Sequence, residues 1–461
     1  MRIPEDSCSK MAIIAPFKGL TYNLERLDDI SNLTAPPYDV ISEQEQEGYY
    51  QADPYNVIRL ILGKKKIGDT DWDNRYTRSA DIYKRWESEE ILVRADTPAV
   101  YVTSLTYDLG DGYGPRLRWG LIALVRIEDE DSRVILPHER TFSAHRDDRL
   151  KLMRACNAQL SQVFGLYEDP DNSVFGPLKE AIEAPPRISF DFRDGTSHQM
   201  WVVPERSILK KVAEAMYDKA IIIADGHHRY ETSRNFRNMM RARYGLRPPN
   251  RAYEFLMIYL TNMNDVGMTI LPSHRLIKKC EPFQLDSFLD SLKPWFEITA
   301  LPSPKPEPSA QGMNLRSMLE EKGRSTSAIA FRCHGDDSCY LFSLKQGVRD
   351  EMGEDLHASL KKLDVLVLSR FIFQKSLGFS KEDLDNEEIF HYKSDMVEAL
   401  SLVDSGDYQM AFLLNPTKMA HVKEVTGNAL IMPRKSTYFY PKVLTGLVFN
   451  KIDPYEIIEV P

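Results

Sequence analysis

The strongest chemical signal in the sequence is an apolar, β-branched run that ends at Asp225 and Gly226. Such a run predicts a buried strand, and a helix is expected to begin directly after it. Glycine permits a tight turn and a close approach of the backbone to a ligand, and the first N–H groups of a helix favour anions. His227, His228 and Arg229 add donors, and arginine can bind phosphate oxygens through two hydrogen bonds. This segment therefore predicts a phosphate pocket.

Two other interpretations of the same segment stay open. Asp225 could simply cap the helix, which would leave the two histidines exposed. A metal site is the second alternative, because His227 and His228 lie four and three residues before Glu231 and either pair would share a helix face. We assign no protein-held metal here, since a nucleotide-bound Mg²⁺ needs few protein ligands.

A second cluster contains His138, Glu139 and Arg140. Glu139 could act as a general base, and His138 or Arg140 could contact a phosphate or serve as an acid. The next histidine, His145, is seven residues away from His138, whereas a zinc-protease motif places two histidines four residues apart. A surface turn with salt bridges is the alternative.

Three further segments carry polar groups that could line a cleft. In the third, two prolines precede Tyr38 and Asp39 and could aim them at a ligand, and Asp39 is a second candidate base. The fourth contains His274 and Arg275 after a strand-like run. The fifth, residues 432–442 (MPRKSTYFYPK), combines basic and hydroxyl groups that suit an anion.

The elements that must position these residues form a mixed α and β pattern, which predicts the α+β class. Expected strands and hairpins cover residues 99–127, 220–224, 254–260 and 328–344, and expected helices cover 147–164, 225–243 and 364–377. The segment 301–312 holds four prolines and predicts an extended linker. We therefore expect an N-terminal α+β part with the catalytic residues (1–300), a linker (301–312) and a C-terminal α+β part (313–461).

Composition narrows the function classes. The 461 residues carry a net charge of −9, which argues against a protein that binds nucleic acid through a general basic surface. No apolar run reaches the roughly 18 residues of a membrane span, and the acidic first residues do not resemble a secretory signal. Five scattered cysteines, an odd number, favour a reducing cytoplasm over a disulfide framework.

Several of these motifs, in order, resemble the DUF1015 family of bacterial and archaeal proteins, whose function is largely uncharacterised. They are listed here as they stand in the sequence: APPYDVI, LPHERT with DRLKLMRACNAQLSQVFGLY, IIIADGHHRYETS, LPSHRLI and MPRKSTYFYPKVLTGLVFN.

The strand, the Asp-Gly-His-His-Arg turn and the helix also resemble the nucleotide-phosphate motif of the ParB/sulfiredoxin superfamily. That superfamily includes CTP-binding partition proteins, sulfiredoxins and free-serine kinases that use ADP or ATP. The resemblance implies a ParB/sulfiredoxin-like core with added sheets and helices, and it implies that residues 225–229 cradle nucleotide phosphates. In the kinases an acidic residue upstream acts as base, for which Glu139 is the first candidate and Asp39 the second.

The leading hypothesis is a nucleotide-dependent phosphotransferase or nucleotide hydrolase. It would use ATP, ADP or CTP with Mg²⁺, and it could act on a small hydroxylated acceptor. Arg140, His274 and Arg275 are added to the turn as candidate nucleotide contacts. The alternatives are a nucleotide-binding regulator without turnover and a metal-dependent hydrolase built on His138, Glu139, His227 and His228. Nucleobase, acceptor and oligomeric state are not fixed by the sequence.

Overall fold

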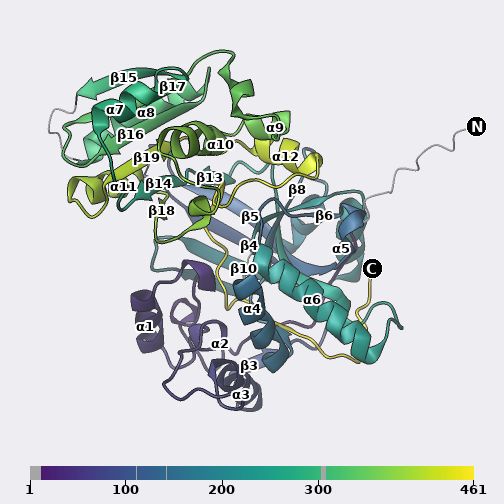
Figure 1. Cartoon of the computed structure of the whole chain (residues 1–461). Helices are drawn as coiled ribbons and strands as arrows, with labels where there is room; N and C mark the ends of the chain where they lie inside the picture. Colours follow the sequence, from purple (N-terminus) through teal and green to yellow (C-terminus); the bar gives the residue numbers. More distant parts are fainter. Residues whose placement is uncertain (1–11, 111, 142, 303–307) are drawn as a thin grey trace, which may run out of the picture. The chain divides into compact units, whose positions relative to one another are not determined.

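The computed structural model describes residues 12–110, 112–141, 143–302 and 308–461 (Figure 1). Helices and several sheets confirm the expected α+β class. The chain divides into two compact units. Unit 1 comprises the chain up to Pro137, Thr141–Met268 and Pro441–Pro461, and unit 2 comprises His138–Arg140 and Thr269–Tyr440.

Unit 1 is built on a mixed sheet, in which nine strands are found in the described part of the chain. Their order is β6-β11-β8-β12-β5-β4-β10-β9, with β1 beside β5. The bounds are β1 Ile14–Ala15, β4 Val100–Tyr107, β5 Arg116–Arg126, β6 Ile135–Leu136, β8 Val163–Tyr167, β9 Ile188–Asp191, β10 Ser197–Val203, β11 Ile221–Asp225 and β12 Phe255–Asn262. Two small ribbons accompany the sheet: β2 Leu20–Tyr22 with β3 Leu92–Arg94, and β7 Ala158–Gln159 with β21 Asn450–Lys451.

The strands expected from 99–127, 220–224 and 254–260 are confirmed as β4 with β5, β11 and β12. Alternate side chains of β5 and apolar side chains of the neighbouring strands form the core of unit 1. Leu121, Ala123, Ile221 and Ile258 in this core are almost fully shielded from solvent. The buried strand β11 thus fixes the position of the turn that follows it.

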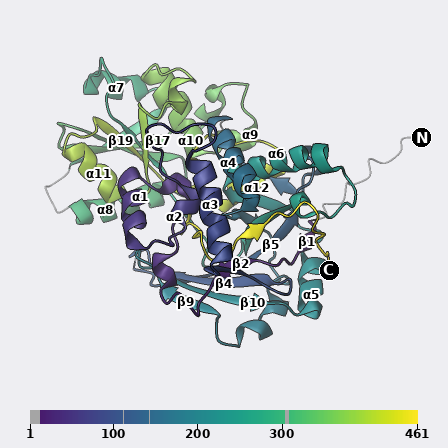
Figure 2. The ribbon, with the colours of Figure 1, turned by 90° about the horizontal axis from the view of Figure 1, so that it is seen from below.

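Helices of unit 1 support this sheet and the turn. They are α1 Glu43–Ala52, α2 Ile58–Ile61, α3 Arg75–Ser88, α4 Ser143–Cys156, α5 Arg206–Met216 and α6 His227–Tyr244. Helices α4 and α6 lie side by side (Figure 1), and α1, α2 and α3 form a group next to α4 (Figure 2). The expected helix 225–243 is confirmed as α6. The helix expected at 147–164 is wrong at its end, because Asn157 adopts a left-handed φ of 49° and Ala158–Gln159 pairs with β21.

Unit 2 contains a six-stranded sheet within the residues described, in the order β15-β17-β16-β19-β14-β18. The bounds are β14 His274–Ile277, β15 Phe296–Pro302, β16 Ala328–Cys333, β17 Ser338–Leu344, β18 Phe390–Lys393 and β19 Met410–Leu414; a separate ribbon joins β13 Thr269–Leu271 to β20 Tyr438–Tyr440. Its helices are α7 Leu285–Leu292, α8 Pro308–Gly323, α9 Ala358–Lys361, α10 Asp364–Val367, α11 Met396–Asp404 and α12 Met419–Gly427. A π-helical segment, Leu368–Ser376, continues α10, which confirms the helix expected at 364–377.

The two faces of this second sheet carry different side chains. Ala328 and Ala330 belong to the face covered by α8 and α11, where small residues allow the helices to pack closely. Phe331 and Phe412 belong to the other face, with ring centroids 5.0 Å apart, and Phe288 of α7 packs on Phe331 at 5.1 Å. The hairpin expected at 328–344 is confirmed as β16 and β17.

The boundaries between the units fall at 137/138, 140/141, 268/269 and 440/441, and not in the Pro-rich segment 301–312 where we expected a linker. The physical reason is strand pairing, because β14, which precedes that segment, pairs with β18 and β19 beyond it. Residues 303–307 of the expected linker lie outside those described, and its flanks belong to β15 and α8.

Four cysteines, Cys156, Cys280, Cys333 and Cys339, carry free thiols. Cys8 and the acidic first residues of the chain lie outside the described residues. Within the part of the chain described here, no helix combines the length and apolar character needed to cross a membrane.

Candidate functional site

The turn between β11 and α6 depends on Gly226. This residue has a φ of 86°, in the left-handed region that favours glycine. A Cβ at this position would lie 2.9 Å from the guanidinium carbon of Arg229, so the arginine packs directly against the glycine backbone. Gly226 has no side chain with which to cap α6, and the 18-residue helix starts with no side-chain cap. The expected tight strand-to-helix turn is confirmed.

Asp225 forms ion pairs with two cations of unit 1. Its Oδ2 accepts from Nη2 of Arg229 at 2.5 Å, and its Oδ1 accepts from Nζ of Lys442. Burial alone would raise the pKa of the Asp225 carboxyl, but the charges of Lys442 and Arg229 hold the pKa well below its usual value. The carboxylate is therefore ionised and positions the two cations, and the helix-capping interpretation of Asp225 is wrong because Gly226 occupies the cap position.

Arg229 is nearly buried, with 9% of its surface exposed. Besides its ion pair with Asp225, it donates from Nη1 to the carbonyl oxygen of Gln162. Its Nε is buried and has no hydrogen-bond partner among the described residues. The guanidinium is thus held rigidly on two sides and keeps one unmatched donor, which is costly to leave buried without an acceptor.

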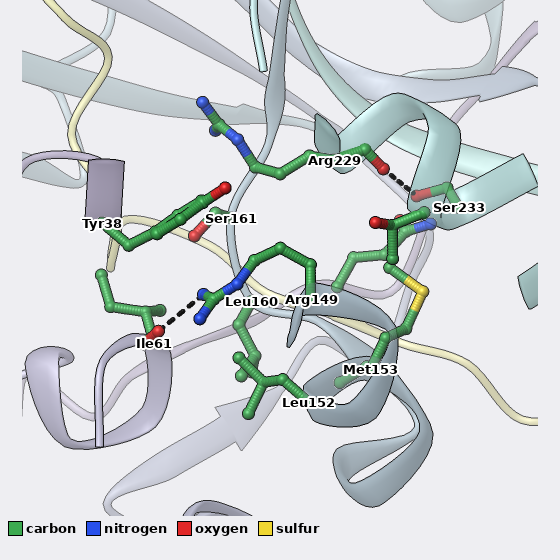
Figure 3. Close-up of a pocket in the computed structure, with 12 residues that line it drawn as sticks. Tyr38, Ile61, Arg149, Leu152, Met153, Leu160, Ser161, Arg229 and Ser233 are labelled. Carbon is green, nitrogen blue, oxygen red and sulfur yellow. Dashed lines mark hydrogen bonds between the residues drawn. The ribbon is translucent and has the colours of Figure 1, made fainter. Parts of the chain in front are cut away.

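A small cavity lies beside this arginine. Its volume is about 40 Å³, and Tyr38, Arg149, Ser161 and Arg229 contribute polar groups to its lining. Figure 3 shows the ring of Tyr38 between the side chains of Arg149 and Arg229, and the guanidinium carbon of Arg149 lies 3.9 Å from the centre of that ring. Burial, followed by the charge of Asp39, raises the pKa of Tyr38 to about 12. The phenol therefore stays protonated at neutral pH.

The two histidines of the turn differ in their surroundings. His227 is buried, whereas the ring of His228 lies 5.0 Å from the ring of His145. Glu231, the third member of the hypothetical metal set, accepts hydrogen bonds from Thr141 and Arg146, each at 2.7 Å. Throughout the described residues, no group of three or more histidine, cysteine or carboxylate side chains is arranged to hold a metal ion.

Three of the sequence motifs meet in unit 2. Nε2 of His138 lies 2.9 Å from Oγ1 of Thr437, and the backbone N–H of Met432 donates to the carbonyl oxygen of His138 at 2.8 Å. Arg275 donates to the carbonyl oxygen of Lys435 at 3.0 Å. The segments around 138, 274 and 432 therefore form one cluster.

Within that cluster the candidate residues differ in their burial and in the pKa shifts that follow from it. Arg275 is buried, and burial lowers the pKa of its guanidinium while the charges of Tyr392 and Glu139 act in the opposite direction. Arg140 is exposed. His274 is fully buried and accepts the N–H of Leu414 at Nδ1 over 3.1 Å. Burial lowers the pKa of His274 to about 3, so its imidazole is neutral.

The predicted site residues thus fall into two groups. Asp225, Gly226, His227, His228, Arg229 and Asp39 belong to unit 1, and His138, Glu139, Arg140, His274 and Arg275 belong to unit 2. Asp39 is exposed and does not line the cavity, whereas its neighbour Tyr38 does. Lys442 ends the basic segment 432–442, which the sequence indicates as an anion site, but its pairing with Asp225 is visible only in the structure.

Solved structures similar to this chain have low identity to it. They include free serine kinase in complex with AMP, with a TM-score of 0.32, 12% identity and coverage of 69% of this chain and 86% of that chain. A mutant of free serine kinase in complex with ADP gives a TM-score of 0.34 and 10% identity over 69% of this chain and 87% of that chain. SbnI with C-terminal truncation from Staphylococcus aureus gives a TM-score of 0.32 and 11% identity, with coverage of 70% of this chain and 85% of that chain.

No curated protein matches the sequence. A family model does match, over residues 14–366, and its description is "Protein of unknown function (DUF1015)". Since this match covers more than half of the chain, the protein belongs to the DUF1015 family.

Proposed function

We propose that the turn at residues 225–229 binds the phosphate groups of a nucleotide, and that the protein is a nucleotide-dependent phosphotransferase or nucleotide hydrolase. The observation that carries this proposal is the buried, immobilised guanidinium of Arg229 with an unmatched Nε donor, beside a cavity and at the start of α6. The resemblance of the turn to the ParB/sulfiredoxin phosphate motif supports a nucleotide as the source of the phosphate.

The size and charge of the site favour a phosphoryl group over a whole nucleotide at this point. A cavity of about 40 Å³ is far smaller than the roughly 300–1,000 Å³ that is typical of ligand pockets. A whole nucleotide does not fit this space, so only its terminal group could enter the cavity and the rest of the nucleotide would lie outside. The positive charges of Arg229 and Arg149 lie around it, and arginine is suited to phosphate oxygens.

Chemistry at such a site would depend on positioning and on neutralising charge, as in other phosphoryl transfers. In an in-line transfer, the bond from the terminal phosphorus to its bridging oxygen breaks, and the nucleotide shortened by one phosphate leaves with that oxygen. The oxygen of an acceptor hydroxyl or of water bonds to the same phosphorus. The proton of that acceptor passes to a base, for which Glu139 and Asp39 are the candidates. A small hydroxylated molecule is the proposed acceptor.

The residues at the turn do not fit a protein-held Mg²⁺. Asp225 is already paired with Lys442 and Arg229, and Glu231 with Arg146, so neither carboxylate is available as a ligand. We therefore assign no step to a protein-bound ion, and Mg²⁺ enters the test as a component of the nucleotide solution.

Calorimetric titration of the full chain with ATP, ADP and CTP, with and without Mg²⁺, tests the proposal. Saturable binding of one nucleotide, together with release of a phosphorylated or hydrolysed product, is the expected result. The proposal is refuted if no nucleotide binds at millimolar concentration.

One observation favours a nucleotide-binding regulator as the second candidate. A bound phosphate would compete with the Asp225 carboxylate for Arg229 and Lys442, and Lys442 belongs to the C-terminal segment of unit 1. Binding could thus change the position of that segment without any turnover. Tight binding with a change in protease sensitivity near Lys442 and no product would identify this alternative.

A further inference from the structure

Unit 2 contains a larger cavity that none of the motifs described above accounts for. It has a volume of about 400 Å³, within the range of roughly 300–1,000 Å³ that is typical of ligand pockets. It lies at the end of the second sheet, where the residues before β16, the start of α10 and the start of α12 come together. Figure 1 shows α9, α10 and α12 grouped there.

The charges around this cavity are unbalanced. Arg324, Arg349, Lys362 and Lys418 line it together with two carboxylates, Glu320 and Asp364. Glu320 is already paired with Arg316 at 3.1 Å, and Lys362 with Glu424 at 2.6 Å. Burial raises the pKa of the Asp364 carboxyl, while its hydrogen bond from Ser327 and the charges of Arg349 and Lys418 act in the opposite direction.

Part of the lining is held in place by a hydrogen-bonded chain. Nη2 of Arg349 donates to Oγ of Ser327 at 2.8 Å, and Oγ of Ser327 donates to Oδ1 of Asp364 at 2.5 Å. Arg349 also donates to the carbonyl oxygen of Lys361 at 2.7 Å. The guanidinium is therefore fixed before any ligand arrives, which lowers the entropic cost of binding.

Two cations of the cavity form no direct ion pair in the described part of the chain, although the charge of Lys418 acts on the Asp364 carboxyl. Arg324 has no ion pair there, and Lys418 has a single long hydrogen bond of 3.4 Å to the carbonyl oxygen of Gly323. Lys418 also precedes α12, a nine-residue helix without a side-chain cap. The helix N-terminus and the two cations together favour an anionic group.

Hydroxyl groups of the lining indicate what else the ligand carries. Oγ1 of Thr326 donates to the carbonyl oxygen of Leu344 at 2.7 Å, and Oγ1 of Thr417 donates to that of Ser436 at 2.6 Å. Each hydroxyl has one proton to donate, so toward a ligand these oxygens can only accept. A partner with hydroxyl donors of its own matches them.

We propose that the cavity of unit 2 binds a small phosphorylated, hydroxyl-bearing molecule of the sugar phosphate class. Arg324, Arg349 and Lys418 hold the phosphate, and Thr326 and Thr417 accept hydrogen bonds from its hydroxyl groups. This site rests on unit 2 residues alone and is independent of the function proposed for the turn in unit 1.

Calorimetry with ribose 5-phosphate, ribose and inorganic phosphate as probes tests the site in the full chain. We expect ribose 5-phosphate to bind more tightly than either of the other two. The exposed residues Arg324 and Lys418 can be replaced without disturbing the core, and Arg324→Ala and Lys418→Ala should each weaken binding at least about tenfold, the loss of one charged hydrogen bond. Lys381→Ala, at an exposed lysine of unit 2 outside the cavity, is the matched control and should bind as the wild type does.

Three results would overturn this inference. The first is an affinity for ribose, or for inorganic phosphate, that equals the affinity for ribose 5-phosphate. The second is unchanged binding of ribose 5-phosphate in Arg324→Ala and Lys418→Ala. The third is loss of ribose 5-phosphate binding in Arg229→Ala. In an Arg229→Ala protein that urea unfolding shows to be folded, the last result would place the ligand at the turn in unit 1. A failure of nucleotide binding at that turn leaves the prediction for unit 2 unchanged.

Discussion

Lys442 donates a hydrogen bond to Asp225, although the two residues are 217 positions apart in the sequence. The pair joins the last segment of unit 1 to the turn that follows its buried strand β11. Since Arg229 contacts the other oxygen of the same carboxylate, Asp225 organises both cations. The stability of the turn is therefore linked to the ionisation of a single buried carboxyl group.

Replacement of Asp225 by asparagine should make this linkage measurable. The pKa of the carboxyl is depressed in the folded protein, so its ion pairs stabilise the fold at pH values above the ordinary value of about 3.9 and lose their effect as the pH falls through the folded pKa. At neutral pH we expect Asp225→Asn to lower the free energy of unfolding by about 3 kcal/mol, the lower end for a broken buried pair. Urea unfolding of both proteins between about pH 7 and pH 3 checks this.

The difference in the free energy of unfolding between the wild type and Asp225→Asn should be constant near neutral pH and should shrink below about pH 4. A difference that stays the same down to the lowest pH would show that the loss comes from altered packing and not from the charge of Asp225.

Arg229→Ala should weaken nucleotide binding by about 1.5–3 kcal/mol, the range for a hydrogen bond to a charged group. It should also lower the free energy of unfolding, because Asp225 loses one of its two cations and Gln162 loses a donor. Arg243→Ala, at the exposed far end of α6, is the matched control. Calorimetry and urea unfolding of both variants check the two effects separately.

A variant that folds as stably as the wild type and binds nucleotide equally well would contradict both roles of Arg229. Arg229→Lys adds a second comparison, because lysine keeps the charge but cannot bind phosphate oxygens with the planar, two-pronged geometry of arginine.

The sequence predicts the local structure of the turn well and its long-range partners poorly. The β-branched run and Gly226 determine a strand and a sharp turn from neighbouring residues alone, and both are confirmed. The predicted end of α4 is wrong because the apolar spacing typical of a helix continues past Asn157. The pairing of Ala158–Gln159 with β21 depends on residues about 290 positions later in the sequence. Likewise, nothing local to Lys442 identifies Asp225 as its partner.

The same limit applies to the grouping of the motifs. Each motif is visible as a cluster of polar residues, but the assignment of Glu139 to unit 2 and of Asp225 to unit 1 follows from strand pairing across distant segments. Local patterns carry propensity and periodicity, whereas the convergence of sites is a property of the tertiary structure.

Glu139→Gln and Asp39→Asn should separate the two candidate bases. Substitution of the residue that is the base should lower the turnover number by about a hundredfold or more, because a general base contributes a factor of about 10²–10⁴ to the rate. The nucleotide affinity should change little. The other variant serves as the control, since it removes a carboxylate charge without removing the base. Initial rates and calorimetric affinities measured on the same preparations give this comparison.

Equal and small effects in the two variants would exclude both carboxylates as the base. Loss of affinity without loss of turnover number would instead assign the affected residue to binding.

His274 should make the fold sensitive to acid. In the folded protein its pKa is lowered to about 3 by burial, whereas the unfolded chain titrates near the ordinary value of about 6.5. The unfolded state therefore binds a proton between these values and the folded state does not, so the stability contributed by the neutral imidazole is present above about pH 6.5 and is lost as the pH falls.

His274→Asn keeps an acceptor for the N–H of Leu414 but cannot titrate. We expect the free energy of unfolding of the wild type to fall more steeply than that of this variant, by up to about 1.4 kcal/mol per pH unit between about pH 6 and pH 4. Parallel slopes in urea unfolding, or an imidazole signal that titrates near its ordinary pKa by NMR, would show that His274 is accessible to protons in the folded protein.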